Sequence, residues 1–324
     1  KSFVLAFRIL PMILVLSALV RLFYHWGLLQ LVVQGFARVL KSTLGIGGPL
    51  ATGAAAAVFL GTVETPLVVK PYLKDMGRGA LFAMMAATMA TVAGSVMALY
   101  AVVLAPVLPG AAGHLLAASL MNVPAALVLA RLAVPQGFSD GGEVAKIDIE
   151  DAPRSSIDAI ARGAMDGIPL VAAVATLLIV SVAMVALINQ LLAFAGGPLG
   201  ITVTLEQLLG WASAPLAWAM GIPVSEATTA GAILGQKIVL NELIAYLDLA
   251  KLTAAELSSR SRLILTYALC GFANVASLGI VIGGLSVLAP ERRLDIVALA
   301  PKSVIIGALA TMLSGAVIGS LTWS

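Results

Sequence analysis

Residues 235–246 read GQKIVLNELIAY and residues 59–66 read FLGTVETP, and each stretch places one carboxylate in apolar sequence close to glycine or proline. The two acids are Glu242 and Glu64. A carboxylate at bilayer depth costs about 2.5–3.5 kcal/mol even on insertion scales, so it marks a functional site by default. Two such acids in interrupted segments from opposite halves of a chain indicate the midplane binding site of a transporter.

The composition predicts an all-α polytopic membrane protein. Hydrophobic residues make up 60% of the 324 residues, charged residues 11%, and the mean hydropathy is +1.06. Long stretches carry no Asp, Glu, Lys or Arg, namely residues 79–130, 167–205, 263–290 and 303–324. Because a helical span needs about 20 apolar residues, the first of these stretches can hold two spans.

The residue content also excludes several function classes. One cysteine and two histidines exclude a disulfide framework and any convincing zinc or haem site, so we expect no cofactor. A net charge of +3 gives no sign of a nucleic-acid partner and suits basic loops at a membrane surface. The chain opens on Lys1 in mid-pattern, without an initiator Met, and we expect that N-terminal spans are missing from it.

Charges, prolines and glycines divide the chain into nine segments. We predict a scaffold span and interfacial helix over 1–44, a re-entrant hairpin over 45–76, a pocket-lining span over 77–108, a scaffold span over 109–135, a solvated loop with an amphipathic helix over 136–166, a scaffold span over 167–204, a second re-entrant hairpin over 205–250, a second pocket-lining span over 258–289 and a C-terminal span over 300–324. Irregular backbone at membrane depth is tolerated where protein or a water-filled cavity covers it.

Polar side chains in the second half extend the candidate site around Glu242. Asn274 and Ser277 lie one helical turn apart in an apolar span. Alone, they would suit packing between helices as well as ligand binding. Beside two membrane carboxylates, we interpret them as one wall of a polar pocket.

Two further charged residues of this half are assigned structural roles. Lys237 precedes Asn241 by four residues, on the same helical face, and we interpret it as a side chain that extends to the membrane interface. Glu226, close to the break at residues 221–223, is expected to pair with a basic residue.

At these residues the chain resembles the concentrative nucleoside transporter family. The family motif (G/A)-x-K-x3-N-E-F-V-A-(Y/M/F) is matched by residues 235–246, with Leu243 for Phe and Ile244 for Val. Residues 261–280 give the second match, and GTVETP at residues 61–66 corresponds to the G-Q-T-E-A-P hairpin tip. The resemblance covers essentially the whole chain, in order.

The resemblance implies a transport domain of two hairpins and two broken helices inside a homotrimeric scaffold. Such a domain moves like an elevator and carries a nucleoside with a coupling cation across a bacterial inner membrane. Carried over by position, Glu242, Asn274 and Ser277 would hold the ribose hydroxyls. The remaining implied contacts are Phe272 in the pocket wall, Val96 against the ligand, and Gly61, Thr62, Val63 and Glu64 at the tip that faces the base.

The tip departs from the family pattern, which leaves other functions open. The family's Gln and Thr are Thr62 and Val63 here, so base recognition should differ or loosen. One alternative is therefore a hairpin symporter for another small polar solute. Another is a non-transporting membrane enzyme or gate protein, although the sequence shows no nucleophile–base arrangement, phosphate loop or metal cluster.

The coupling ion is the second point of departure. The Asn that gives sodium a side-chain oxygen in the family corresponds to Ala57 here. The other sodium positions fall on Leu60, Thr91 and Val92. Sodium needs several oxygen ligands in place of its water, whereas a proton needs a single carboxylate. We therefore expect proton coupling through Glu64, with sodium coupling as the alternative.

Overall fold

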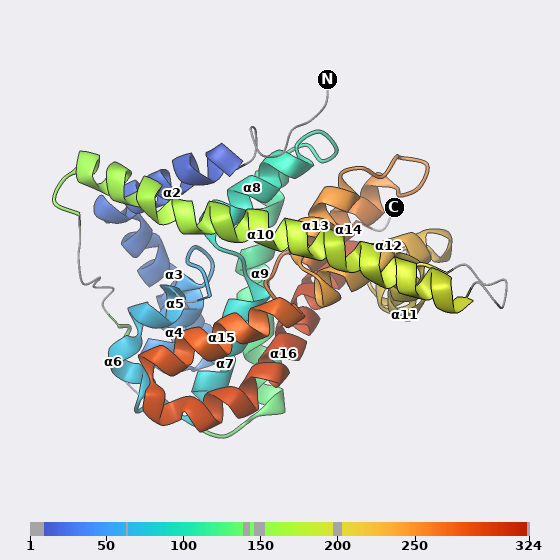
Figure 1. Cartoon of the computed structure of the whole chain (residues 1–324). Helices are drawn as coiled ribbons and strands as arrows, with labels where there is room; N and C mark the ends of the chain where they lie inside the picture. Colours follow the sequence, from blue (N-terminus) through green and yellow to red (C-terminus); the bar gives the residue numbers. More distant parts are fainter. Residues whose placement is uncertain (1–9, 63, 139–142, 146–152, 197–202, 323–324) are drawn as a thin grey trace.

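The computed structural model describes residues 10–62, 64–138, 143–145, 153–196 and 203–322 (Figure 1). Every regular element in these residues is helical. The stretches long and apolar enough to cross a membrane are 78–104, 111–133, 178–196 and 290–321, and two bent helix pairs qualify when each pair is taken together. The expected all-α polytopic fold is confirmed.

Helix α2 packs against α10 and leads into α3. Helix α2 (Leu10–His25) meets α3 (Leu28–Leu44) at 74°, with the left-handed Gly27 between them. Helix α10 (Ser156–Gly196) is 41 residues long and crosses the whole molecule in Figure 1. It packs against α2 so closely that a Cβ on Gly163 would lie 2.7 Å from the Cα of Ala18.

The loop predicted over 136–166 needs a correction at its second half. The expected separate amphipathic helix forms the first turns of α10 and runs without interruption into the span predicted over 167–204. Pro169 is accommodated inside this helix, and Gly163 and Gly167 both approach α2. Continuous contact with α2 therefore keeps the two predicted segments in one helix.

The two predicted hairpin segments are both interrupted, in different ways. In the first, α4 (Gly48–Ala56) leads through residues 57–62 to α5 (Glu64–Val68) and the short α6 (Lys70–Leu73). In the second, α11 (Leu205–Ala219) and α12 (Val224–Val239) meet at 117° around the left-handed Gly221. A second interruption at residues 240–241 then precedes α13 (Glu242–Leu249).

Each predicted pocket-lining span consists of two half-helices. In the first span, α7 (Arg78–Ala90) and α8 (Gly94–Leu104) are separated by extended backbone that starts at Thr91. In the second, α14 (Ser259–Leu269) and α15 (Val275–Leu288) are separated by residues 270–274. These are the broken helices of the predicted fold class.

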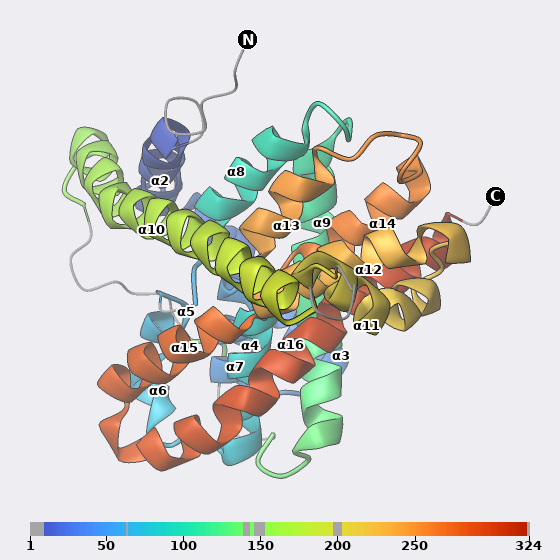
Figure 2. The ribbon, with the colours of Figure 1, turned by 45° about the vertical axis from the view of Figure 1, so that its right-hand side comes forward.

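Two long helices hold the broken ones in place. Helix α9 (Ala111–Ala133) fills the predicted scaffold span over 109–135. The C-terminal helix α16 (Arg293–Leu321) follows the 3-10 turn η2 (Pro290–Arg292) and begins before the predicted residue 300. In both ribbon views α16 lies alongside α7 and α15 (Figure 2).

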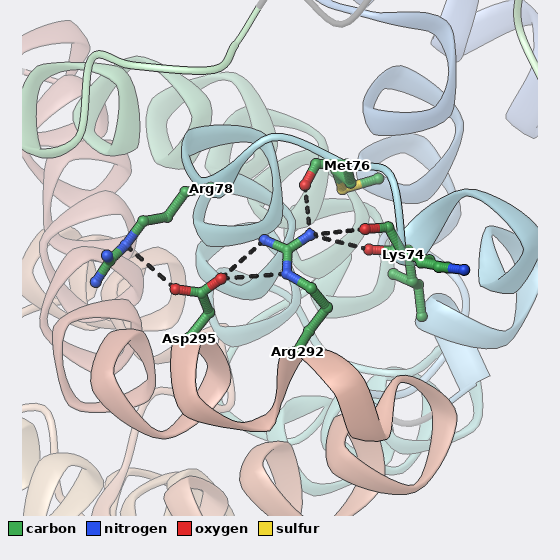
Figure 3. Close-up of polar contacts among 6 residues, drawn as sticks. Lys74, Met76, Arg78, Arg292 and Asp295 are labelled. Atoms are coloured by element: carbon green, nitrogen blue, oxygen red, sulfur yellow. Dashed lines mark hydrogen bonds and ion pairs between the residues drawn. The ribbon is translucent and has the colours of Figure 1, made fainter.

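Arg292 ties the first hairpin to α16, and we call this contact the Arg292 clamp (Figure 3). Its Nη1 donates to the carbonyl oxygens of Leu73, Lys74 and Met76 at 3.3, 3.2 and 2.6 Å. Its Nε and Nη2 donate to Oδ2 of Asp295 at 3.2 and 3.1 Å, and Oδ1 of Asp295 lies 3.6 Å from Nε of Arg78. A cation at carbonyls that end a helix is favourable because it meets the negative end of the helix dipole.

Candidate functional site

Glu242 lies at the second interruption of the 205–250 segment, as the first residue of α13. The side chain of Asn241 caps this helix by accepting from the backbone N–H of Ile244 at 3.0 Å. Glu242 itself is only 5% exposed. Its Oε1 accepts from the hydroxyl of Tyr100 at 2.7 Å, and its Oε2 accepts from Nδ2 of Asn274 at 2.9 Å. The carboxylate is thus fixed by donors from α8 and from the break between α14 and α15.

Asn274 and Ser277 form one connected polar wall. Asn274 is the N-cap of α15, where its Oδ1 accepts from the backbone N–H of Ser277 at 2.8 Å and from its Oγ at 3.0 Å. A side-chain amide can donate and accept at once, which is why one asparagine holds both the helix end and the carboxylate. Asn241 and Asn274 therefore perform the same capping role at two neighbouring breaks.

The interrupted segments are joined to one another through their backbones. The N–H of Gly94 donates to the carbonyl of Phe59 at 2.8 Å, which links the first hairpin to the α7–α8 break. The N–H of Phe272 donates to the carbonyl of Thr91 at 3.1 Å, which links the two broken helices. A break leaves backbone N–H and C=O groups without a partner in their own helix. Here such groups form hydrogen bonds with the backbone of a neighbouring break, as buried polar groups need a partner.

Asn122 of α9 completes this junction, and it is not among the residues predicted from the sequence. It is fully buried, and its Nδ2 donates to the carbonyls of Ala90 at 2.9 Å and of Cys270 at 2.7 Å. Ala90 is the last residue of α7 and Cys270 directly follows α14, so a single amide caps both broken helices. The hint in the sequence is an isolated Asn two residues before Pro124 in an apolar stretch.

The tip of the first hairpin lies at the mouth of the same site. Glu64 begins α5 and is exposed, and its Oε2 accepts from the backbone N–H of Gly61 at 3.0 Å. In the part of the chain that the structure describes, no cation forms an ion pair with Glu64. Val63, which the sequence places at the tip, lies outside the described residues.

Most of the predicted site residues line one cavity of about 1140 Å³. Those present are Leu60, Gly61, Thr62, Glu64, Val96, Glu242, Phe272, Asn274 and Ser277. Tyr72 and Tyr100, which the sequence did not single out, also line it, together with Ser95 and Asn241. A large apolar cavity with a few convergent polar groups is the default binding site of a protein.

Two of the predicted cation positions do not reach this cavity. Thr91 and Val92 are both buried and are absent from its lining. The hydroxyl of Thr91 donates to the carbonyl of Ala87 at 3.0 Å, within its own helix. The carbonyl of Thr91 already accepts from Phe272. Both oxygens of Thr91 are therefore engaged in holding the break.

The interpretations of Lys237 and Glu226 were wrong. Lys237 is fully buried instead of extending to the interface, and its Nζ donates to the carbonyl of Ala268 at 3.2 Å and to Oγ1 of Thr311 at 2.8 Å. Glu226 accepts from the N–H and the hydroxyl of Ser258 at 3.2 and 3.0 Å, and it forms no ion pair with a basic residue among those that the structure describes. The spacing of residues along a helix predicts on which face each side chain lies, but not how deeply it is buried in the protein.

Comparison with known families agrees with this geometry. Residues 114–319 match the family model described as the C-terminus of Na+ dependent nucleoside transporters, and residues 6–107 match a model described as nucleoside recognition. The chain belongs to the concentrative nucleoside transporter family. The resemblance found in the sequence is confirmed, and the membrane-enzyme alternative is set aside for a transporter.

Similar members of the nucleoside transporter family come from bacteria and from animals. Nucleoside permease NupC of Helicobacter pylori is 39% identical, over 98% of this chain and 76% of the relative. The putative nucleoside permease NupX of Escherichia coli is 37% identical, over 98% and 76%. Solute carrier family 28 member 3 of Mus musculus is 33% identical, over 98% of this chain and 47% of the relative.

Solved structures of this family share the fold. CNTnw in an inward-facing substrate-bound state superposes with a TM-score of 0.88 at 38% identity, over 99% of this chain and 77% of that one. A CNTnw variant in a state called intermediate 2 gives a TM-score of 0.92 at 39% identity, over 99% and 77%. The protein is therefore a multi-pass membrane transporter of the nucleoside transporter fold.

Proposed function

We propose that the protein carries nucleosides across a bacterial inner membrane, coupled to the entry of a cation. The observation that carries this proposal is the place of Glu242, a buried carboxylate in the cavity wall held by Tyr100 and Asn274. A carboxylate at membrane depth is costly. Glu242 lies at a cavity, and it forms no ion pair within the described part of the chain.

The chemistry of this wall suits the ribose of a nucleoside. A carboxylate accepts from both of two adjacent hydroxyl groups, while Asn274 and Ser277 offer groups that donate as well as accept. Because these groups are buried, a ligand without ribose hydroxyls would leave them unpaired, and the site would reject it. We infer that Glu242, Asn274 and Ser277 bind the ribose.

The base would lie between Phe272, Val96 and the tip of the first hairpin. These side chains line the same cavity as Glu242, together with Gly61 and Thr62. Phe272 and Val96 offer apolar surface, and Thr62 offers one hydroxyl, so few polar groups face the base. We expect the protein to accept several bases. The alternative is that the altered tip selects another small polar solute.

For the coupling ion, we favour a proton at Glu64. This carboxylate lines the cavity, forms no ion pair among the described residues, and accepts from Gly61 N–H through one oxygen. Protonation there would alter the charge of the tip beside the substrate. Sodium is the alternative, and its candidate position at Thr91 has both oxygens engaged.

The proposed transport cycle is alternating access of the elevator type. Hairpins and broken helices would move as one body past a scaffold that includes α2 and α10, and three copies of the chain would form the scaffold. The backbone bonds among Phe59, Gly94, Thr91 and Phe272 support movement as one body, because they join the hairpin to both broken helices.

Uptake of radiolabelled uridine into proteoliposomes tests the proposal. We expect an inward proton gradient to drive accumulation in the wild-type protein and Glu64→Gln to abolish that accumulation. Glu226→Gln is the matched control, because this acid bonds to Ser258 away from the cavity. Accumulation driven by sodium alone would assign coupling to sodium. No accumulation under either gradient would redirect the search to other polar solutes.

A further inference from the structure

Lys237 is a buried cation for which the transport site gives no obvious reason. It is fully buried in α12, and its ammonium contacts a carbonyl and a hydroxyl. Among the residues that the structure describes, no carboxylate lies within ion-pair distance of it. A buried charge without an opposite partner costs several kcal/mol, which makes a purely structural role an expensive one.

The ammonium lies at the end of α14, the half-helix that precedes the ribose wall. The last carbonyls of α14 are met by side chains of three other helices: Tyr246 donates to Thr266 at 2.8 Å, Lys237 to Ala268, and Asn122 to Cys270. Such carbonyls form the negative end of a helix dipole, where a cation is favoured.

The other broken helix provides a contrast. At the end of α7 the carbonyl of Ala90 accepts from Asn122, and the carbonyl of Ala87 accepts from the hydroxyl of Thr91. Both of these donors are neutral. In the described residues, the positive charge therefore lies at the break that carries Asn274 and contacts Glu242, whereas the donors named at the other break are neutral.

We propose that Lys237 is a positioning residue that supplies a fixed positive charge for the ribose site. The charge stabilises the end of α14, and with it the place of Asn274. We infer that the same charge also balances Glu242, which Asn274 joins to this break by donating to its Oε2. In a low-dielectric interior, charges attract over distances longer than contact.

A lysine that balances the charge of Glu242 from a distance has a chemical advantage over one that forms a direct ion pair with it. Lysine in contact with Glu242 would donate to its oxygens and so compete with the substrate. With Lys237 directed at Ala268 and Thr311, the carboxylate keeps lone pairs for ribose hydroxyls beside its bonds to Tyr100 and Asn274. This inference rests on the proposed ribose site.

The test is equilibrium binding of uridine and of 2′,3′-dideoxyuridine to the purified full chain. The ratio of the two affinities reports the ribose contacts alone. Three variants separate charge from hydrogen bonding: Lys237→Arg keeps both, Lys237→Gln keeps a donor without charge, and Lys237→Met keeps neither. We expect Lys237→Gln and Lys237→Met to reduce the preference for uridine about tenfold, and Lys237→Arg to keep most of it. Thermal unfolding in detergent should show that all three variants are folded.

Several results would overturn the inference. A preserved preference in Lys237→Gln would mean that the hydrogen bond alone matters. Loss in proportion to the midpoint of thermal unfolding, or failure of all three variants to fold, would assign Lys237 to structure. Glu242→Gln, measured in the same assay, separates the two levels. If Glu242→Gln keeps the preference for uridine, the proposed ribose site is wrong. If Glu242→Gln loses the preference while Lys237→Met keeps it, the ribose site stands and only the role proposed for Lys237 is wrong.

Discussion

Tyr100 is the side chain that most directly controls Glu242 in the absence of substrate. Its hydroxyl donates to Oε1 at 2.7 Å, and its ring lies 4.7 Å from that of Tyr246. A hydrogen bond to a charged group contributes about 1.5–3 kcal/mol. Tyr100 therefore sets the direction in which the carboxylate points when a nucleoside arrives.

Tyr100→Phe should weaken uridine binding by about tenfold, because about 1.4 kcal/mol corresponds to a factor of ten. Tyr246→Phe is the matched control, since its hydroxyl donates to the carbonyl of Thr266 instead of to Glu242. Tyr246→Phe should lower the stability of the protein and leave its affinity for uridine nearly unchanged. Isothermal titration with both variants checks the difference, and equal affinities for wild type and Tyr100→Phe would contradict the role given to the phenol.

Asn122→Leu should destabilise the protein strongly. The change leaves the carbonyls of Ala90 and Cys270 without their shared donor, and each unsatisfied buried group costs about 1–3 kcal/mol. We expect a fall of several degrees in the midpoint of thermal unfolding. Ser119→Ala is the control on the same helix, where a contact with Sγ of Cys270 at 3.5 Å is lost. Equal midpoints for the two variants would show that Asn122 does not cap the breaks.

The sequence identified some of these residues and missed others for a physical reason. Glu242, Asn274 and Ser277 could be predicted because a polar group in an apolar span is conspicuous. Tyr100 was missed because its partner is 142 residues away and the residues around it in α8 are apolar. Lys237 was misplaced because spacing along a helix carries no information on depth. Partners of this kind are decided by packing between helices.

At the scale of elements, the Arg292 clamp determines how the first hairpin is attached. One guanidinium joins carbonyls at and just after the end of α6 to Asp295 of α16 (Figure 3). Charge-assisted bonds of this kind are about twice as strong as neutral ones. We therefore expect the backbone amides at the end of the first hairpin to exchange their hydrogens more slowly than most amides at the surface.

Arg292→Ala should speed amide hydrogen exchange in residues 73–78, because these residues lose their attachment to α16. We expect exchange there to rise by about tenfold, in line with the loss of 1.5 kcal/mol or more. Arg293→Ala, an exposed neighbour at the start of α16, is the control and should change nothing at residues 73–78. Unchanged exchange in Arg292→Ala would refute the clamp.

Breaks in helices were predictable only where glycine or proline marks them. The turn at residues 221–223 was recognised from Gly221 and Pro223, yet it lies outside the cavity lining, where Arg260 donates to the carbonyl of Gly221 at 2.6 Å. The break at residues 240–241, which does reach the cavity, contains neither residue type. It is stabilised by the Asn241 cap instead, and by Ser181 of α10, which accepts from Nδ2 of Asn241 at 3.3 Å.

At the scale of the whole molecule, the proposed trimer gives a direct expectation. Along α10 the side chains of Ile179, Val182 and Phe194 are exposed, so this helix needs lipid or another protein surface around it. Native mass spectrometry of the detergent-solubilised protein should find three copies of the chain. A monomer at the same concentration would contradict the trimeric scaffold.

Above all, we propose that Glu242, Asn274 and Ser277 hold the ribose of a nucleoside in the large cavity. The most direct measurement is an experimental structure of the protein with uridine bound. We predict the ribose hydroxyls within hydrogen-bonding distance of the Glu242 carboxylate and of Asn274, with the base between Phe272 and the tip at Gly61 and Thr62. Uridine bound outside this cavity, or with its ribose turned away from Glu242, would contradict the claim.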